Sequence, residues 1–201
     1  MSSALSSGVA VVVPAFDGGP ALLRCLDALC SSSIAPASVI LVDNASGDSS
    51  IGRALERHPG LLLVEHDANL GFARACNAGI ERAGAADLVF VVNQDAVVAR
   101  DTLERLALFM AGRARAGAVG PRTLSLAPLP GGAPRLLYAG SWRTWLPLRQ
   151  RVPGIERADP GGAGGAGRGD YRWGHGALFR REALPQVGGF DEKYFLYYED
   201  L

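Results

Sequence analysis

The chain has 201 residues, 48% of them hydrophobic, and its 20 basic residues balance 20 acidic ones. A chain of this length buries enough apolar surface to fold as one domain without disulfides or a structural metal. Zero formal net charge argues against nucleic acid as the main partner, and the apolar content excludes a wholly disordered chain.

The first 120 residues alternate between strand and helix patterns. Apolar runs typical of buried strands occupy residues 9–13, 39–42, 61–64 and 88–92. Apolar residues at helical spacing follow each run, and these patterns begin near Pro20, Asp48, Phe72 and Asp101. The expected N-cap of the second helix is Asp48 or a neighbouring serine, and that of the fourth is Asp101. This alternation predicts an α/β fold with right-handed crossovers and a mainly parallel sheet.

The regular pattern fades after Pro121, where residues 128–134 and 159–170 are rich in Gly, Pro and Ala. The second of these segments is predicted to be a mobile loop. Order returns at Tyr171, and residues 188–192 predict a turn that leads into an aromatic segment.

Cysteine usage and the chain's start indicate a cytoplasmic protein. Residues 1–8 lack the Lys or Arg that begins a secretory signal peptide, and no stretch approaches the roughly 20 apolar residues of a membrane span. The three cysteines form no CxxC pair. Cys25 and Cys30 lie within an apolar-periodic stretch, so buried, reduced thiols are expected in a reducing compartment.

Ligands of open α/β sheets bind beyond the carboxyl ends of the strands. Here those ends are residues 14–17, 43–48, 66–71 and 93–95. Residues 14–17 read Pro-Ala-Phe-Asp rather than GxGxxG, which argues against a nicotinamide-dinucleotide site, and no GxxxxGK motif of a P-loop occurs.

The carboxylates at these ends have two interpretations each. Asp95 can hold Mg²⁺ or Mn²⁺ shared with a diphosphate, or form a turn satisfied by its own backbone. Asp43 can accept hydrogen bonds from a base or ribose, or form an Asx turn before a capped helix.

Gly71 permits a close approach of the backbone to a ligand, at a helix start that favours anions. Arg74 either contacts a base or phosphate or stays solvated.

Five blocks, in order, resemble the successive motifs of family 2 glycosyltransferases, and most nearly the rhamnosyltransferase-like branch. They are VVVPAFDGGPALLRCLDAL, ILVDNASGDSS, NLGFARACNAGI, LVFVVNQDAVV and GALFRREALPQVGGFDEKYFLYYED. The resemblance implies a GT-A fold, a Rossmann-like sheet flanked by helices. It also implies an inverting transferase that uses a nucleotide-diphospho-sugar, such as dTDP-rhamnose or a UDP-sugar, and a divalent metal, Mg²⁺ or Mn²⁺.

The resemblance further implies a glycan or lipid-linked acceptor at the cytoplasmic membrane face, with peripheral membrane association. It implies one domain over residues 1–201, with a nucleotide-binding half at 8–120 and an acceptor-side half at 121–201. We predict that the 159–170 loop overlies the acceptor side. The oligomeric state is left open.

Carried over residue by residue, the resemblance assigns roles to matching positions. Donor-binding residues are Pro14, Ala15, Asp43, Asn69, Gly71, Arg74, Asn93, Gly176 and Ala177, with Asp43 at the base and Gly176 and Ala177 at the donor sugar. Asn93-Gln94-Asp95 stands for the metal-binding DxD-type motif, with Asp95 as the ligand. Glu199 and Asp200 are the acidic pair beside the acceptor, with Asp200 as the general base.

Three departures from the family pattern bear on these roles. The first-strand loop usually reads Thr-Tyr-Asn, whereas Ala15-Phe16-Asp17 lacks the hydroxyl and adds a charge. The metal motif starts with Asn93 rather than Asp, as this branch often shows. The family continues past its acidic pair with a further helix and strand, whereas one residue follows Asp200 here.

We therefore expect this chain to bind donor but to transfer sugar slowly or not at all. A truncated, non-catalytic nucleotide-sugar-binding fragment, or a subunit completed by a partner, is the alternative function. A nucleotidyltransferase is less favoured, because residues 14–20 lack a basic residue for a triphosphate.

Overall fold

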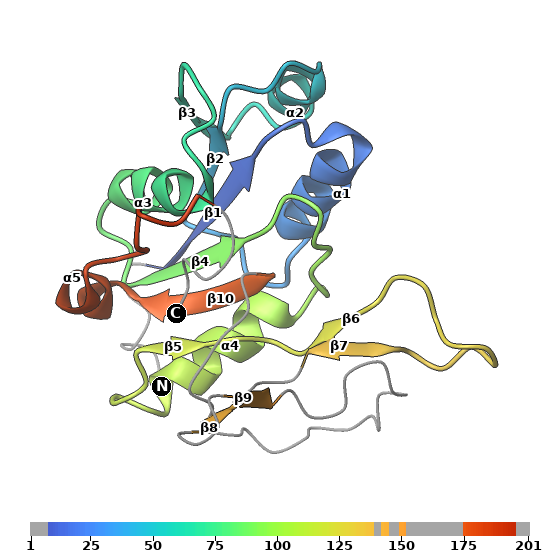
Figure 1. Ribbon diagram of the computed structural model, residues 1–201, viewed down its shortest axis with the longest axis vertical. Coiled ribbons are helices and arrows are strands. Elements are labelled where there is room, and N and C mark those ends of the chain that lie inside the picture. The colour runs from blue at the N-terminus through green and yellow to red at the C-terminus, as the bar shows by residue number, and fades with distance from the viewer. Residues whose placement is uncertain (1–7, 139–141, 145–148, 152–174, 196–201) are drawn as a thin grey trace. The chain divides into compact units, whose positions relative to one another are not determined.

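The computed structural model describes residues 8–138, 142–144, 149–151 and 175–195, which fall into two compact units (Figure 1). Residues 8–119 and 175–195 belong to the first unit. The second unit begins at Gly120, where the sequence pattern fades, and residues 175–195 return to the first unit. The predicted loop at 159–170, Glu199 and Asp200 lie outside the described residues.

The first unit is built on a six-stranded sheet in the order β3-β2-β1-β4-β10-β5. Its strands are β1 (Val9–Ala15), β2 (Ser38–Asp43), β3 (Leu62–Glu65), β4 (Leu88–Val92), β5 (Ala118–Val119) and β10 (Gly176–Arg180). β1 to β4 run parallel, whereas β10 pairs antiparallel with β4 and β5. The predicted mainly parallel α/β sheet is confirmed.

Helices cover both faces of this sheet, because alternate residues of each strand are apolar on opposite faces. The helices are α1 (Gly19–Cys30), α2 (Ser50–Arg57), α3 (Phe72–Arg82) and α4 (Thr102–Ala111), and the 3₁₀ turn η1 (Arg181–Ala183) and α5 (Leu184–Val187) follow β10. Val11 and Val13 pack in one core with residues of α1, α2 and α4, and Ala10 and Val12 pack in another with α3. α1 and α2 thus lie on one side of the strands and α3 on the other (Figure 1).

The second unit contains two small antiparallel sheets. β6 (Thr123–Leu124) pairs with β7 (Leu136–Tyr138), and β8 (Trp142–Thr144) pairs with β9 (Arg149–Arg151). In the described part of the chain, no helix has the length and apolar character needed to cross a membrane.

Local sequence signals explain most helix starts. Pro20 lies in the first turn of α1, where no backbone donor is needed. Ser49 is the N-cap residue of α2, and Asp48, one residue earlier, accepts the Ser50 N–H through Oδ1 at 2.9 Å. Asp101 is the N-cap residue of α4, as predicted, but its side chain makes no capping hydrogen bond and pairs with Arg105, one turn on, at 2.6 Å.

The cysteine prediction is partly wrong. Cys25 and Cys76 are buried, whereas Cys30 is exposed. Cys30 is the last residue of α1, where the buried stripe of the helix has already ended at Leu29.

α1 and α2 are joined by a bidentate ion pair on the surface. Asp27 accepts hydrogen bonds from Arg57 Nε at 2.6 Å and Nη2 at 2.9 Å, and lies 3.0 Å from His58 Nε2. The hydrogen bonds with Arg57 are the main reason that the pKa of Asp27 is lowered. This pair is remote from the ends of the strands that carry the site.

α3 packs close to the sheet because residue 79 is glycine. A Cβ at Gly79 would clash with Val12 Cγ1 and would lie 3.0 Å from Val42 Cγ2. Since α3 carries several predicted site residues at its start, this contact sets how near those residues approach the strand ends.

We expect Gly79→Ala to lower the free energy of unfolding by about 1–3 kcal/mol through overpacking. Gly52→Ala in α2 is the matched control, because nothing lies within 4 Å of a Cβ there. In an exposed helix that change is neutral or stabilises by up to about 1 kcal/mol. Urea unfolding followed by circular dichroism measures both variants, and equal stability of the two would contradict the packing argument.

Candidate functional site

A pocket of about 280 Å³ opens in the first unit where β1 and β4 end. Its walls come from four loops and from the segment after α5. The lining residues are Pro14, Ala15, Phe16, Asn44, Asn69, Gly71, Phe72, Asn93, Gln94, Asp95 and Phe195. The pocket therefore lies at the carboxyl edge of the sheet, where open α/β sheets bind ligands.

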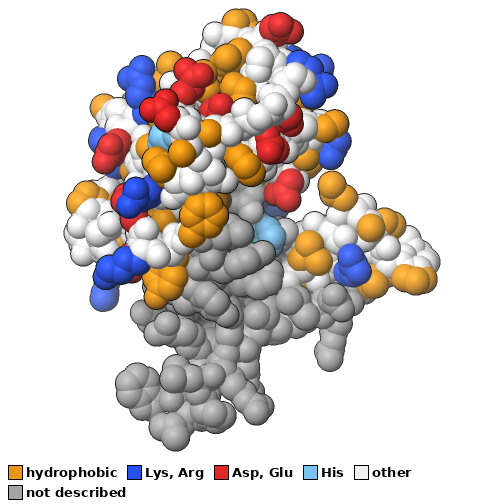
Figure 2. All heavy atoms as spheres, turned by 45° about the horizontal axis from the view of Figure 1, so that its top comes forward, with side chains coloured by type: hydrophobic (Ala, Val, Ile, Leu, Met, Phe, Trp, Pro, Cys, Tyr) orange, Lys and Arg blue, Asp and Glu red, His pale blue; other side chains and the backbone are white. Residues whose placement is uncertain are grey.

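The described surface facing the viewer in Figure 2 mixes acidic, basic and apolar side chains. No broad single-charge area is visible among the described residues on that face.

Carboxylates join the loops that follow β1 and β2. Asp17 Oδ1 accepts the backbone N–H of Gly47 at 2.7 Å and of Asp48 at 3.2 Å, and the Asp17 N–H donates to Ser46 Oγ at 3.1 Å. Asp17 has a φ of 47°, a left-handed conformation that Asp tolerates better than most residues. The carboxylate that departs from the family pattern is exposed, and its hydrogen bonds link the loop after β1 to the loop after β2.

Asp43 makes a local hydrogen bond to the backbone, three residues on rather than the two residues of an Asx turn. Its Oδ1 accepts the Ser46 N–H at 2.9 Å, which folds the loop back on the end of β2. Asp43 pairs in register with Ala15 of β1. Asp43 is not among the residues that line the pocket.

Gln94 is a residue whose role was not seen in the sequence. Its side chain pairs with the backbone of Phe16 in both directions, accepting from Phe16 N at 3.0 Å and donating to Phe16 O at 2.9 Å. A Cβ at Gly18 would lie 2.5 Å from Gln94 Oε1, so glycine leaves room for this bridge. An amide directly after a strand end was the available signal, but its partner is 78 residues away.

Asn93 and Asp95 supply oxygen atoms on either side of Gln94. Asp95 is exposed, whereas Asn93 Oδ1 is buried and has no hydrogen-bond partner among the described residues. Both residues line the pocket. Oxygen ligands of this kind suit Mg²⁺ or Mn²⁺, which take their other ligands from phosphates and water. Among the described residues, no three or more His, Cys, Asp or Glu side chains come together in a group that could hold a metal ion.

Cys25 lies beneath this segment as a structural thiol. Burial, helped by the nearby Asp95 carboxylate, raises the pKa of Cys25 to about 12. Its Sγ donates to the backbone oxygen of Asn93 at 3.5 Å. A thiol that stays protonated is a poor nucleophile and a poor metal ligand, so Cys25 supports the Asn93 backbone instead.

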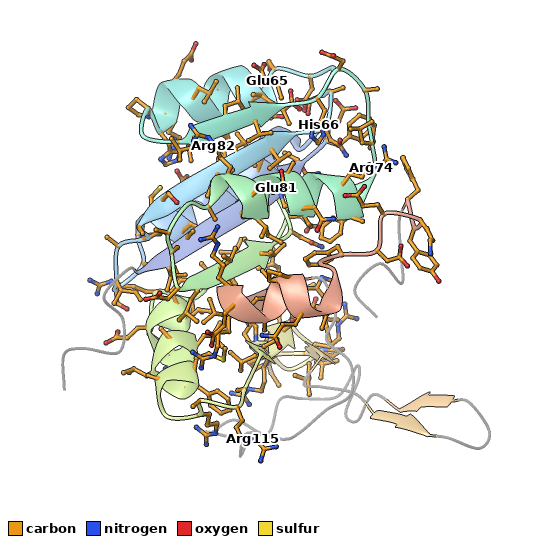
Figure 3. All side chains as sticks on the ribbon, turned by 90° about the vertical axis from the view of Figure 1, so that its left-hand side faces the viewer. Glu65, His66, Arg74, Glu81, Arg82 and Arg115 are labelled. Carbon is orange, nitrogen blue, oxygen red and sulfur yellow. The ribbon has the colours of Figure 1, made fainter. Side chains whose placement is uncertain are left out.

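The start of α3 closes another side of the pocket. Gly71 has a φ of 88°, and a Cβ there would lie 2.6 Å from the Phe195 carbonyl oxygen. That oxygen accepts the Phe72 N–H at 3.0 Å. The Phe195 carbonyl therefore satisfies one of the backbone N–H groups at the start of α3, which have no partner within the helix. Arg74 lies in the first turn of the helix (Figure 3) and pairs with Glu192 at 3.5 Å, with both side chains about half exposed (51% and 49%).

Asn77 also holds the segment after α5, a role that the sequence did not suggest. Its Nδ2 donates to Phe190 O and its Oδ1 accepts from Phe190 N, both at 3.0 Å. A Cβ at Gly189 would lie 2.8 Å from Asn77 Oδ1, and Gly189 has a φ of 74°. The predicted turn at 188–192 is therefore fixed against α3.

The sequence of this chain matches a known family along most of its length. Residues 10–188 fit the model of glycosyl transferase family 2. The chain belongs to glycosyl transferase family 2. It is 34% identical over 212 residues to the N-acetylglucosaminyl-diphospho-decaprenol L-rhamnosyltransferase of Mycobacterium tuberculosis, covering 95% of this chain and 67% of that protein. The resemblance to the rhamnosyltransferase-like branch is confirmed.

Solved structures of GT-A glycosyltransferases share its fold. The mannosyltransferase PcManGT of Pyrobaculum calidifontis, in complex with GDP-Man and Mn²⁺, superposes with a TM-score of 0.63 at 25% identity, over 96% of this chain and 49% of that one. The structure of GalNAc-T7 with UDP, GalNAc and Mn²⁺ superposes with a TM-score of 0.71 at 15% sequence identity, over 96% of this chain and 39% of that one. The chain thus spans half or less of the length of these two structures. The predicted GT-A fold is confirmed.

The pocket of this family 2 chain gathers six of the predicted site residues and leaves others around it. Those in its walls are Pro14, Ala15, Asn69, Gly71, Asn93 and Asp95. Gly176 and Ala177 are buried in β10, where Gly176 pairs with Val92, the residue before Asn93. Asp43 and Arg74 are not in the walls of the pocket, and Glu199 and Asp200 lie outside the described residues.

We expect Asp17→Ala to lower the free energy of unfolding by about 1–2 kcal/mol, since two hydrogen bonds to a carboxylate are lost. Asp17→Asn should lose less than half as much, because an amide oxygen can still accept both N–H groups. Urea unfolding compares the two, and an equal loss would show that the hydrogen bonds to Gly47 and Asp48 are not what stabilises the loops.

Proposed function

We propose that this protein is an inverting glycosyltransferase that moves a sugar from a nucleotide-diphospho-sugar to a hydroxyl of a glycan or lipid-linked acceptor. The observation that carries the proposal is the pocket at the strand ends of a family 2 chain. Its walls include the exposed Asp95 and also Asn93, whose Oδ1 has no hydrogen-bond partner among the described residues. The rhamnosyltransferase relative favours dTDP-rhamnose as donor, with a UDP-sugar as the second choice.

Asp95 and Asn93 would hold a divalent metal, Mg²⁺ or Mn²⁺. An exposed carboxylate and a buried amide oxygen with no partner in the described part of the chain fit such an ion, and the two solved structures compared above each contain Mn²⁺. The ion's chemistry would be to neutralise the charge that grows on the departing diphosphate. Gln94 fixes the segment between these two ligands by its bridge to Phe16.

The nucleotide would lie along the ends of β1 and β2. Pro14 and Ala15 border it, and Asp43 accepts hydrogen bonds from the base. Arg74 would turn from Glu192 to the nucleotide or its diphosphate, which costs little because an exposed ion pair at 3.5 Å is weak. Gly176 and Ala177 would border the donor sugar.

Asp200 would act as general base, with Glu199 beside it. The carboxylate takes the proton of the acceptor hydroxyl, whose oxygen bonds to the anomeric carbon opposite the diphosphate. The bond between that carbon and the diphosphate oxygen breaks, and the configuration at the carbon inverts. The diphosphate leaves with the electron pair of the broken bond.

The acceptor class follows from the same relative, whose name specifies a diphospho-decaprenol substrate. We place this protein in the cytoplasm at the inner face of the membrane, in peripheral association, with no nucleic-acid partner.

Asp95→Asn should remove divalent-dependent donor binding while leaving the fold intact, because Asp95 is exposed at a strand end. Calorimetry with UDP- and dTDP-sugars, with and without Mn²⁺, measures the donor affinity and its dependence on the metal. Asp101→Asn is the control, since it removes another exposed carboxylate, in a pair with Arg105, without touching the pocket. Unchanged Mn²⁺ dependence in Asp95→Asn would place the ligand elsewhere, and no metal-dependent binding by the unmodified protein would refute the function.

Asp200→Asn should lower sugar transfer by roughly 10²–10⁴-fold, the usual span for general acid–base catalysis, with nucleotide affinity nearly unchanged. Transfer to a lipid-linked glycan acceptor and calorimetric affinity for the nucleoside diphosphate are measured on the same preparation. Transfer at the unmodified rate by the variant would rule out Asp200 as the base.

A further inference from the structure

Asn44, directly after β2, makes an unusually complete set of hydrogen bonds. It is 5% exposed, and Asn44 and Ser50 are the buried polar residues of the described chain. Its Nδ2 donates to Asn69 Oδ1 at 2.8 Å and to Gly71 O at 3.2 Å. Its Oδ1 accepts from Leu70 N and from His66 Nδ1, each at 3.0 Å.

These contacts use the whole hydrogen-bonding capacity of the Asn44 side chain. A primary amide has two N–H donors and one oxygen with two lone pairs, and all four positions are taken. Asn44 lines the pocket but has no position left for a ligand. Its effect on a ligand must therefore pass through the residues that it holds.

The residue that it orients most directly is Asn69. Asn69 Oδ1 accepts from Asn44 Nδ2 and from Gly71 N, the latter at 3.0 Å. With two donors pointing at Oδ1, the amide of Asn69 has one favourable orientation. No hydrogen bond within the described part of the chain uses Asn69 Nδ2, and Asn69 lines the pocket.

We propose that Asn69 meets the nucleotide-sugar donor as a hydrogen-bond donor through Nδ2, and that Asn44 is the positioning residue that fixes this orientation. The ligand group is an oxygen acceptor of the nucleoside diphosphate. The proposal rests on the function proposed above, and it adds the direction of the hydrogen bond and the residue that sets it.

The arrangement also explains why the interaction is built from two amides. A carboxylate at position 69 would accept from Asn44 and Gly71 equally well, but it would present a second negative oxygen to a diphosphate. A carboxylate at position 44 would leave Asn69 Oδ1 and Gly71 O facing an oxygen instead of an N–H. His66, which comes from the end of β3 (Figure 3), and the Leu70 N–H hold the other end of the Asn44 amide.

The first test is Asn69→Asp, which keeps the internal acceptor and removes the N–H donors. Affinity for UDP and dTDP, measured by calorimetry at saturating Mn²⁺, should fall tenfold or more, while the urea unfolding midpoint stays that of the unmodified protein. Unchanged affinity in this variant would overturn the proposal. If the unmodified protein binds neither nucleotide, the proposed function fails, and this inference fails with it.

The second test is a double-mutant cycle of Asn44→Asp with Asn69→Ala. If Asn44 acts through Asn69, Asn44→Asp weakens nucleotide binding tenfold or more in the unmodified protein and has little further effect in the Asn69→Ala background. Full additivity of the two losses would overturn the positioning role. If Asn44→Asp does not fold, Asn69→Asp still tests whether Asn69 donates a hydrogen bond to the nucleotide.

Asp27→Asn is the control for general loss of stability, because it breaks the α1–α2 ion pair outside the pocket. It should lower the unfolding midpoint without changing nucleotide affinity. A loss of affinity in this control equal to that of Asn44→Asp would show that destabilisation alone weakens binding, and would overturn the positioning role.

Discussion

The site depends on one constraint, which is that the central strands of the sheet are buried on both faces. β1 and β4 are covered by α1 and α4 on one side and by α3 on the other, and their side chains are apolar almost without exception. Polar groups are expelled from such strands, because an unpaired buried polar group costs free energy. They therefore collect in the loops at the carboxyl edge, where the strand ends bring them together.

Hydrogen bonds to the backbone then give those loops a fixed shape. Asp17 holds the loop after β2, Gln94 holds the loop after β1, and Asn44 holds the loop before α3. Each of these side chains satisfies backbone groups that no regular element pairs. A pocket built in this way is shaped before a ligand arrives, so less ordering is needed on binding.

α3 connects the two sides of the site. Its start borders the pocket, Arg74 in its first turn pairs with Glu192, and Asn77 in the next turn bonds to Phe190. Gly79 allows this helix to approach the sheet closely. The segment after α5 is thereby tied to the same helix whose start lines the pocket.

The sequence by itself determined the parallel sheet, its helices and the edge that carries the site, because hydrophobic periodicity and strand-end polar residues are local signals. The ordered motifs also determined the family. Only the tertiary structure showed that Asp17 bonds to the backbone of Gly47 and that Gln94 pairs with Phe16. It also showed that the Asn44 amide donates to the Asn69 amide. These pairs join residues 25 to 78 positions apart, and no local pattern specifies which polar side chain meets which backbone group once the strands align.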